Sequence, residues 1–414
     1  QKSNREKYLM SDFYQNGYFT TFHNFRSKKM SEINEELTEF SKKRPMQLIL
    51  PSLYSELLGT ALPDIVNKLK KASYIKQITI GLDNANREEF NKAKVFFSQL
   101  PQKVRILWHD GPKMQSISNI LRENGLDASV PGKGRNVWYC MGYVYGLKNC
   151  EAVALHDCDI LTYDLDMLAR LFYPIANPAY NFYFCKGYYS RIAQNKMNGR
   201  VGRLLVSPLV DALKIMSDDK SGFLDFIKAF RYPLSGEFSF RRRLIRDIRI
   251  PFDWGLEIGM LSEVHRNFSK NMFCQVDIAD QYDHKHQNVS YNDSARGLSK
   301  MSFDIIKTFI RKLANQGIGY NKDSLRALKA TYYRTALDYI SSYSFDARMN
   351  GIEVDINTEE KIVELFAENI FEAGLLVLDK PMEMNLMPNW SRVRSAVPRI
   401  YDRLEEAVEL DNKS

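Results

Sequence analysis

The stretch Ala152-Val153-Ala154-Leu155-His156-Asp157-Cys158-Asp159 decides the fold that we expect for this chain. Its first half is a short apolar run, of the kind found in strands that are buried on both faces. The run ends abruptly at two aspartates spaced i and i+2. An unpaired buried carboxylate is costly, so we expect both aspartates at the open end of the strand and outside the core. The stretch therefore predicts a buried strand that delivers two acidic side chains to one edge of a sheet.

Further strand patterns lie on both sides of this stretch: Met46–Pro51, Ile78–Leu82, Val104–Trp108 and Phe273–Ile278. Two helical patterns, Tyr54–Lys71 and Arg87–Leu100, lie between the first three of them. Strands that alternate with helices predict βαβ units and a mostly parallel sheet. After about residue 295 only helical spacing remains, in Met301–Asn315, Asp323–Tyr343, Thr358–Glu372 and Trp390–Val408. We therefore expect an N-terminal arm (1–45), an α/β domain (46–295) and an all-helical C-terminal region (296–414).

Composition narrows the classes of protein to consider. The chain has 414 residues, of which 44% are hydrophobic and 26% charged, which excludes a wholly disordered protein. No apolar run approaches the roughly 18 to 20 residues of a membrane span. The net charge of +8 suits an anionic ligand, but no zinc-finger or RNA-binding pattern accompanies it, so we do not expect nucleic acid as a partner. The five cysteines never form a Cys-x-x-Cys pair, which favours a reducing cytoplasm.

The chemistry is expected at the strand ends, because ligands of open parallel sheets bind outside the carboxyl ends of the strands. Polar groups follow one strand at Pro51–Glu56, and Asp157-Cys158-Asp159 follows another. Carboxylate oxygens are preferred ligands of Mg²⁺ and Mn²⁺, ions that often complete their shell with substrate phosphates. A turn or a helix cap that uses the same two aspartates is the alternative.

Two further motifs favour the metal-site interpretation. Pro131-Gly132-Lys133-Gly134 places a lysine between glycines at the start of a helical pattern, an arrangement suited to a diphosphate. Tyr282-Asp283-His284-Lys285-His286 follows the last strand pattern and offers a histidine as a late metal ligand.

The order of these motifs resembles that of a nucleotide-sugar glycosyltransferase of the GT-A type. It is most similar to the retaining glucosyl-3-phosphoglycerate synthases of glycosyltransferase family 81, with mannosylglycerate and mannosyl-3-phosphoglycerate synthases as near relatives. Beyond the motifs quoted above, the matching pieces are Lys186-Gly187-Tyr188-Tyr189-x-Arg191, Gly199-Arg200-Val201, Pro233-Leu234-x-Gly236-Glu237 and Trp254–Gly259. Together they span roughly residues 46 to 290. The resemblance implies a GT-A fold, with a Rossmann-like, mostly parallel sheet.

The same resemblance implies a role for each matched position. Asp159 and His284 would ligate Mg²⁺ or Mn²⁺. His286 is the alternate ligand, because the segment after Ile278 is one residue longer than the family pattern. Glu237 would be a ligand of the sugar or acceptor, and it is also the nearest candidate for a covalent nucleophile. The nucleotide sugar would contact Pro51, Ser52, Glu56, Asp83, Lys133, Asp157, Leu234 and Gly236.

The acceptor, 3-phosphoglycerate or glycerate, would be gripped by Gly199 and Arg200. The family carries a threonine where this chain has Gly202, and we expect Arg191 and Arg203 to compensate for the lost hydroxyl. The implied reaction transfers glucose or mannose with retention. Two alternatives remain open: a sugar nucleotidyltransferase, and a nucleotide-sugar-binding protein without transfer activity. The apolar C-terminal helices, together with the resemblance, also predict a homodimer.

Overall fold

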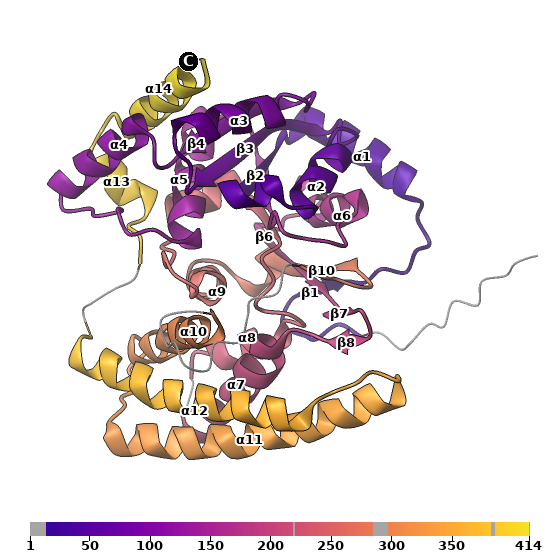
Figure 1. The fold of residues 1–414 in the computed structure, drawn as a ribbon, viewed down its shortest axis with the longest axis vertical. Coiled ribbons are helices and arrows are strands. Elements are labelled where there is room, and N and C mark those ends of the chain that lie inside the picture. The colour runs from indigo at the N-terminus through magenta and orange to yellow at the C-terminus, as the bar shows by residue number, and fades with distance from the viewer. Residues whose placement is uncertain (1–13, 218–219, 285–296, 382–385, 414) are drawn as a thin grey trace, which may run out of the picture.

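The computed structural model describes residues 14–217, 220–284, 297–381 and 386–413. Its central feature is one eight-stranded sheet in the order β1-β10-β6-β9-β5-β2-β3-β4 (Figure 1). The strands are β1 (Thr20–Phe22), β2 (Met46–Leu53), β3 (Ile75–Asp83), β4 (Lys103–Trp108), β5 (Ala152–Leu155), β6 (Phe184–Tyr189), β9 (Phe238–Arg241) and β10 (Phe273–Ala279). Neighbouring strands are parallel except where β9 pairs with β5 and β6. The predicted α/β fold with a mostly parallel sheet is therefore confirmed.

Helices cover both faces of the sheet, and each face has its own apolar core. One face is covered by α1 (Met30–Lys43), α2 (Ala61–Leu69), α3 (Arg87–Phe97) and α6 (Leu165–Ala176). The other is covered by α4 (Pro112–Glu123), α5 (Lys133–Leu147), α7 (Ser207–Met216), α8 (Phe223–Ala229) and α9 (Leu256–Asn267). Shorter elements are η1 (Tyr54–Leu58), η2 (Val201–Val206), η3 (Arg242–Arg246), η4 (Lys270–Met272), and a small hairpin of β7 (Ile192–Ala193) and β8 (Lys196–Met197).

Two local predictions in the first half of the sheet were wrong. The strand expected over Met46–Pro51 does not end at Pro51, because β2 continues to Leu53 along β3. Pairing with β5 has already ended at Ile49, so no ladder hydrogen bond on that side needs the missing N–H of Pro51. The single helix expected over Tyr54–Lys71 is divided at Gly59 into η1 and α2.

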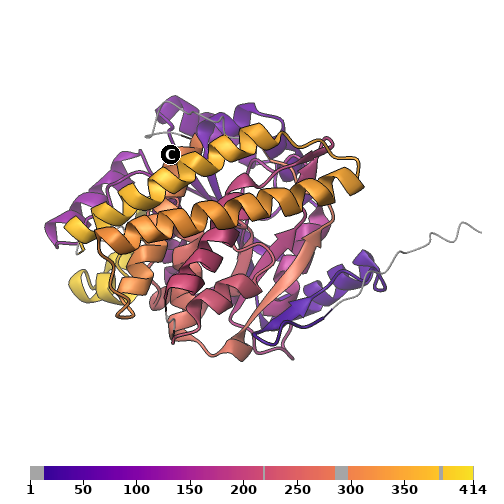
Figure 2. The ribbon, with the colours of Figure 1, turned by 90° about the horizontal axis from the view of Figure 1, so that it is seen from below.

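The C-terminal region consists of α10 (Gly297–Ala314), α11 (Lys322–Met349), α12 (Ile356–Asp379), α13 (Trp390–Ala396) and α14 (Ile400–Lys413). The long helices α11 and α12 form a hairpin whose arms lie side by side (Figure 2). Helix α14 returns to pack on α4, α5 and β4. The prediction of a single helix over Trp390–Val408 is wrong. The helix is interrupted between α13 and α14 at Pro398, which has no N–H to donate. None of the helices in the described ranges is long and apolar enough to span a bilayer.

Candidate active site

A cavity of about 1210 Å³ opens beyond the carboxyl ends of β2, β3 and β5. Most of the residues that the sequence placed in the site line it: Pro51, Ser52, Glu56, Asp83, Lys133, Asp157, Asp159, Arg191, Gly199, Arg200, Leu234, Gly236 and His284. Glu237 and Arg203 do not line it. His286 lies outside the described residues.

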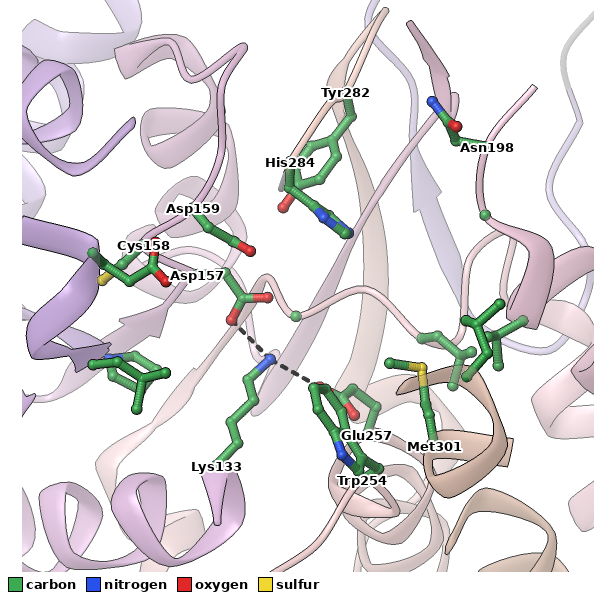
Figure 3. A pocket seen from close by; sticks show the side chains of 18 of the residues that line it. Lys133, Asp157, Cys158, Asp159, Asn198, Trp254, Glu257, Tyr282, His284 and Met301 are labelled. Atoms are coloured by element: carbon green, nitrogen blue, oxygen red, sulfur yellow. Dashed lines mark hydrogen bonds and ion pairs between the residues drawn. The ribbon is translucent and has the colours of Figure 1, made fainter. Parts of the chain in front are cut away.

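One end of this cavity is acidic. Figure 3 shows the carboxylates of Asp157 and Asp159 and the imidazole of His284 around the same part of it. His284 is brought there by an isolated antiparallel bridge to Ile160, directly after Asp159. Gly236 lies against Asp157, and a Cβ at this position would come within 2.4 Å of Asp157 Oδ2. A glycine is therefore needed for the carboxylate to occupy this position.

The two aspartates differ in their electrostatic environment. Burial alone would raise the pKa of Asp157, but the Lys133 ammonium, 2.7 Å from Oδ1, holds this pKa below its usual value. Asp159 has no hydrogen bond or ion pair with any residue that the structure describes. Burial, together with the neighbouring Asp157 charge, raises the pKa of Asp159 to about 7.

A divalent cation fits this end of the cavity. Its positive charge would compensate the carboxylate of Asp159. Carboxylate oxygens and an imidazole nitrogen are ligands that Mg²⁺ and Mn²⁺ accept. No three such side chains are already gathered around one point among the described residues. This is compatible with a cation of this kind, because Mg²⁺ usually keeps several waters and binds through one or two carboxylates and substrate phosphates.

Lys133 lies between the acidic end and the loop that precedes α9. The glycines beside it make room for the backbone of that loop, because Cβ atoms at Gly132 and Gly134 would lie 2.3 Å from Phe252 O and 1.9 Å from Pro251 O. This close approach brings Glu257 within 3.2 Å of Lys133 Nζ (Figure 3). Burial alone would lower the pKa of Lys133, but Asp157 and Glu257 outweigh burial and raise it.

Glu257 is a site residue that sequence reasoning did not assign. Glu257 extends from α9, lines the cavity and forms an ion pair with Lys133. The sequence feature that points to Glu257 is the Trp254–Gly259 motif, which matches the family but for which we predicted no function of the glutamate.

Some of the positions that are expected to contact the nucleotide sugar lie at the ends of β2 and β3. Asp83 lines the cavity, and its carboxylate is held by Arg135 and by Asn136 Nδ2, the latter at 2.9 Å. Ser52 donates its hydroxyl hydrogen bond to Leu53 O at 3.0 Å. These contacts fix one carboxylate and one hydroxyl at the strand ends before any ligand arrives.

Glu237, for which the resemblance implies contact with the sugar or acceptor, is not among the residues that line the cavity. Its carboxylate is buried behind two tyrosines and accepts hydrogen bonds from Tyr189 and Tyr282 at 2.7 Å each, and from Ser235 at 2.9 Å. The two tyrosine rings stack 3.7 Å apart and line the cavity. Glu237 therefore supports the floor of the site without reaching its interior.

The cavity lining also includes two arginines, Arg191 and Arg200, whose part of the lining we call the basic end. Arg191 lies over the ring of Tyr282 at 5.3 Å and lines the cavity together with Arg200. Gly199, just before Arg200, has a φ of +72°, in the left-handed region that favours glycine. Tyr232 fills the space beside Gly202, where a Cβ would lie 2.9 Å from the tyrosine ring.

Arg203, which was expected to help bind the acceptor, is not among the residues that line the cavity either. Its guanidinium is buried and forms an ion pair with Glu359 of α12. Arg203 consequently points away from the cavity, although Arg200 lines it only three residues earlier.

No family model matches the chain. It is 44% identical to the glucosyl-3-phosphoglycerate synthase of Persephonella marina over 97% of this chain and 99% of that protein. It is 38% identical to the glucosyl-3-phosphoglycerate synthase of Methanococcoides burtonii over 97% of this chain and 98% of that protein.

Solved structures were compared as well. The glucosyl-3-phosphoglycerate synthase from Mycobacterium tuberculosis, crystallised with Mn²⁺, uridine diphosphate and phosphoglyceric acid, matches 73% of this chain and 88% of its own, with a TM-score of 0.52 and 17% identity. The mannosyl-3-phosphoglycerate synthase from Rubrobacter xylanophilus matches 69% and 84%, with a TM-score of 0.51 and 18% identity. At these identities the structural matches establish a shared fold.

Proposed function

The chain belongs to the glucosyl-3-phosphoglycerate synthases, and on that premise we propose that it transfers glucose from a nucleoside-diphosphate sugar to 3-phosphoglycerate. It is a glycosyltransferase of the family that its motifs predicted. The observation that supports this reaction best is that acidic and basic groups line the same cavity. Asp157, Asp159 and His284 line it, and so do Arg191 and Arg200.

The acidic end suits the donor. Asp159 and His284 would hold Mg²⁺ or Mn²⁺, with Asp157 beside them. When bound, such an ion compensates the negative charge of a departing nucleoside diphosphate. Lys133 keeps Asp157 ionised and holds Glu257 close to the same space, which fixes the carboxylates around the donor.

The basic end suits the acceptor. Guanidinium groups bind phosphate in a bidentate manner, and Arg191 and Arg200 both line this end of the cavity. The chain's contribution to the reaction is mainly positioning and electrostatic stabilisation. The hydrogen bonds that Tyr189 and Tyr282 donate to the Glu237 carboxylate support a mechanism in which this residue is not a covalent nucleophile. The mechanism that we propose is therefore front-face transfer, in which the acceptor attacks on the side from which the diphosphate leaves and the configuration is retained.

A grid of donors and acceptors tests this proposal. Uridine, guanosine and adenosine diphosphate sugars carrying glucose or mannose would each be paired with 3-phosphoglycerate and with glycerate, in Mn²⁺ and in EDTA. The proposal expects a nucleoside diphosphate and a glucosylated phosphoglycerate, with no turnover in EDTA. Release of pyrophosphate would identify a nucleotidyltransferase instead. Binding of nucleotide sugar without any transfer would identify a binding protein.

A cytoplasmic location is proposed on separate grounds. All five cysteines are free and buried, which suits a compartment that keeps thiols reduced. Fractionation of cells that express the full-length protein would test this location.

A further inference from the structure

The segment 195–206 lies between the basic end of the cavity and the α11–α12 hairpin, and it carries Arg200. We propose that the hairpin holds this segment in its acceptor-binding position, and that Glu359 is the positioning residue, acting through Arg203. This inference rests on the proposed function, because it assigns the acceptor to the site that contains Arg200.

The first step in the argument is what Arg203 holds. Its Nε donates to the carbonyl oxygen of Asn198 at 3.1 Å, and its Nη2 donates to that of Met197, also at 3.1 Å. These two carbonyls directly precede Gly199 and Arg200. The side chain of Arg203 therefore fixes the backbone from which Arg200 extends into the cavity.

The second step is what holds Arg203. Its guanidinium forms two hydrogen bonds with the carboxylate of Glu359, one of them at 3.1 Å, and lies 5.1 Å from the ring centre of Tyr343 on α11. Both charged side chains are buried. A buried arginine needs a counter-charge, so the position of Glu359 on α12 determines where Arg203 rests.

Other contacts join the same two parts of the chain. Asn195 Nδ2 donates to Gly351 O at 3.0 Å, and Lys196 forms a parallel bridge with Glu353. Gly351 and Glu353 belong to the turn between α11 and α12. Tyr332 of α11 donates to Leu204 O at 2.6 Å. The hairpin thus contacts the segment both before and after Arg200.

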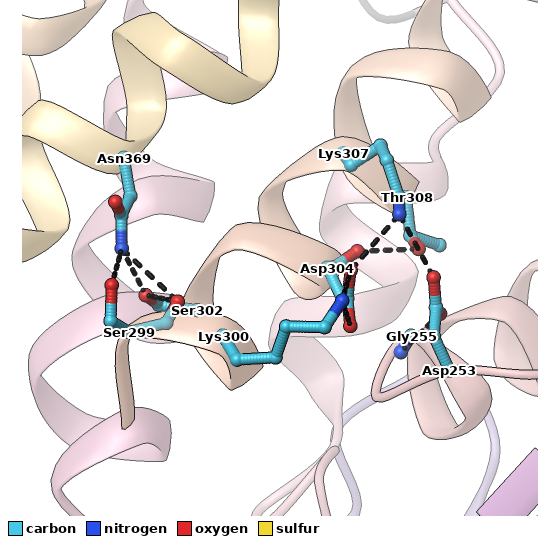
Figure 4. Close-up of polar contacts among 9 residues, drawn as sticks. All are labelled: Asp253, Gly255, Ser299, Lys300, Ser302, Asp304, Lys307, Thr308 and Asn369. Atoms are coloured by element: carbon cyan, nitrogen blue, oxygen red, sulfur yellow. Dashed lines mark hydrogen bonds and ion pairs between the residues drawn. The ribbon is translucent and has the colours of Figure 1, made fainter. Parts of the chain in front are cut away.

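The hairpin is itself anchored to the donor side through α10 (Figure 4). Asn369 of α12 donates to Ser302 Oγ at 2.7 Å and to Ser299 O at 3.1 Å. Further along α10, Lys307 donates to Asp253 at 2.9 Å, and Asp253 accepts from Gly255 N two residues before Glu257. Because α12 is tied to the loop before α9, it offers a fixed support and not a loose flap.

The experiment compares Michaelis constants for the two substrates in Glu359→Gln and in wild type. Displacing a substrate-binding group by about 1 Å can cost on the order of 100-fold, so we expect the acceptor KM to rise about 10- to 100-fold. The KM for the nucleotide sugar and the slow hydrolysis of that sugar without acceptor should both stay within about twofold of wild type. Glu359→Asp, which keeps the charge, should recover much of the acceptor affinity.

Two further variants separate positioning from general damage. Glu368 lies on the same helix and pairs with Lys329 of α11 at 2.6 Å, and Glu368→Gln should leave both Michaelis constants unchanged. The double variant Arg203→Met with Glu359→Met replaces a buried ion pair by apolar side chains, which often preserves stability. We expect it to unfold at a temperature near that of wild type and still to bind acceptor weakly, because the carbonyls of Met197 and Asn198 have lost their donor.

Amide hydrogen exchange gives a readout that does not depend on the acceptor. In Glu359→Gln, exchange should accelerate in 195–206 but not in α4. An unchanged acceptor KM with unchanged exchange, or an equal rise in both Michaelis constants, would overturn the inference. Failure of wild type to glucosylate 3-phosphoglycerate would instead overturn the proposed function, while the exchange result would still decide whether Glu359 holds the segment.

Discussion

Asp157 and Asp159 show how residues two positions apart can differ in charge state. Lys133 compensates Asp157, whereas burial and Asp157 raise the pKa of Asp159 to about 7. A carboxyl group must lose its proton before it ligates a metal. With the pKa of Asp159 at about 7, Mn²⁺ should therefore bind about tenfold more tightly at pH 8 than at pH 6. Titration calorimetry at both pH values measures this difference.

Variants of the ligands sharpen that prediction. Asp159→Asn should bind Mn²⁺ weakly and lose the pH dependence. His284→Ala should also bind weakly. If His286→Ala weakens binding while His284→Ala does not, the residue outside the described ranges is the ligand, and the assignment of His284 is wrong.

Arg200 provides a test of the acceptor end. Arg200→Ala should raise the acceptor KM much more than the donor KM, because a hydrogen bond to a charged group is worth about 1.5 to 3 kcal/mol. Initial-rate kinetics with each substrate varied in turn gives both constants. Equal effects on the two constants would remove Arg200 from the acceptor site.

Lys186 on β6 is an unusual buried charge. It is 1% exposed, and its Nζ has no hydrogen-bond partner among the described residues. Burial lowers the pKa of Lys186 to about 8, although Glu257 and Glu237 act to raise it. Between this pKa and the ordinary value of 10.5, the unfolded chain holds a proton that the folded chain lacks, so stability rises with pH over that interval.

Lys186→Met removes this dependence. Between pH 8 and pH 10 the free energy of unfolding of wild type should therefore rise by roughly 2 kcal/mol relative to that of the variant, because each pKa unit corresponds to about 1.4 kcal/mol. Urea unfolding at the two pH values measures it. Lys71→Met, at an exposed position, should follow wild type, and a Lys186→Met variant that did the same would show that the ammonium is not desolvated.

The site residues that sequence could identify are those whose roles follow from a strand end. Asp83, Asp157 and Asp159 lie where buried strands finish, and the strand pattern is local. The sequence could not show that Glu237 and Arg203 lie outside the cavity lining, because what they contact is set by distant residues. Glu237 meets tyrosines 48 and 45 residues away, and Arg203 meets a glutamate 156 residues away.

At the scale of elements, the strands predicted from continuous apolar runs are present as β2, β3, β4, β5 and β10. The strand β9 is missing from the prediction, because it has only four residues, Phe-Ser-Phe-Arg, and directly follows a motif that we interpreted as a binding loop. Its antiparallel direction depends on its position between β5 and β6, with both of which it pairs, and no local pattern encodes that position. The strand nevertheless shapes the site, because it fixes Gly236 against Asp157.

The contact between α5 and the loop before α9 is another such long-range feature, and it can be tested. Gly134→Ala would place a Cβ 1.9 Å from Pro251 O, and this carbonyl belongs to backbone that cannot rotate away. Overpacking of this kind costs about 1 to 3 kcal/mol, so the variant should unfold at lower urea concentration than wild type. Nucleoside diphosphate should also bind more weakly, because Lys133 and Glu257 move apart.

Gly319→Ala is the matched control, because nothing lies within 4 Å of the added Cβ. It should leave urea unfolding and nucleotide binding as they are in wild type. If Gly134→Ala behaves in the same way, then the close approach of the two backbones is not what sets the position of Lys133.

At the scale of the whole molecule, the open question is assembly. The dimer was predicted from apolar side chains crowded into the C-terminal helices, but most of these are buried within the chain itself, among them Ile306, Phe309, Ile362 and Phe366. The most exposed large apolar side chains that the structure describes in this region are at the end of the hairpin, where Phe345 is 70% exposed, Met349 90% and Ile356 45%. Exposed apolar side chains that cluster in this way often mark an interface.

The dimer therefore stays a prediction that now depends on the hairpin end. Twofold pairing is the commonest symmetry of soluble oligomers, and a stable interface buries on the order of 1,600 Å². Light scattering at micromolar concentration should give about twice the 48.1 kDa of one chain. Phe345→Asp combined with Met349→Asp should reduce that mass to a single chain, because the charges would be desolvated at the interface. Val95→Asp, equally exposed on α3, should leave it unchanged. A single-chain mass for wild type would show that the hairpin supports only its own acceptor segment.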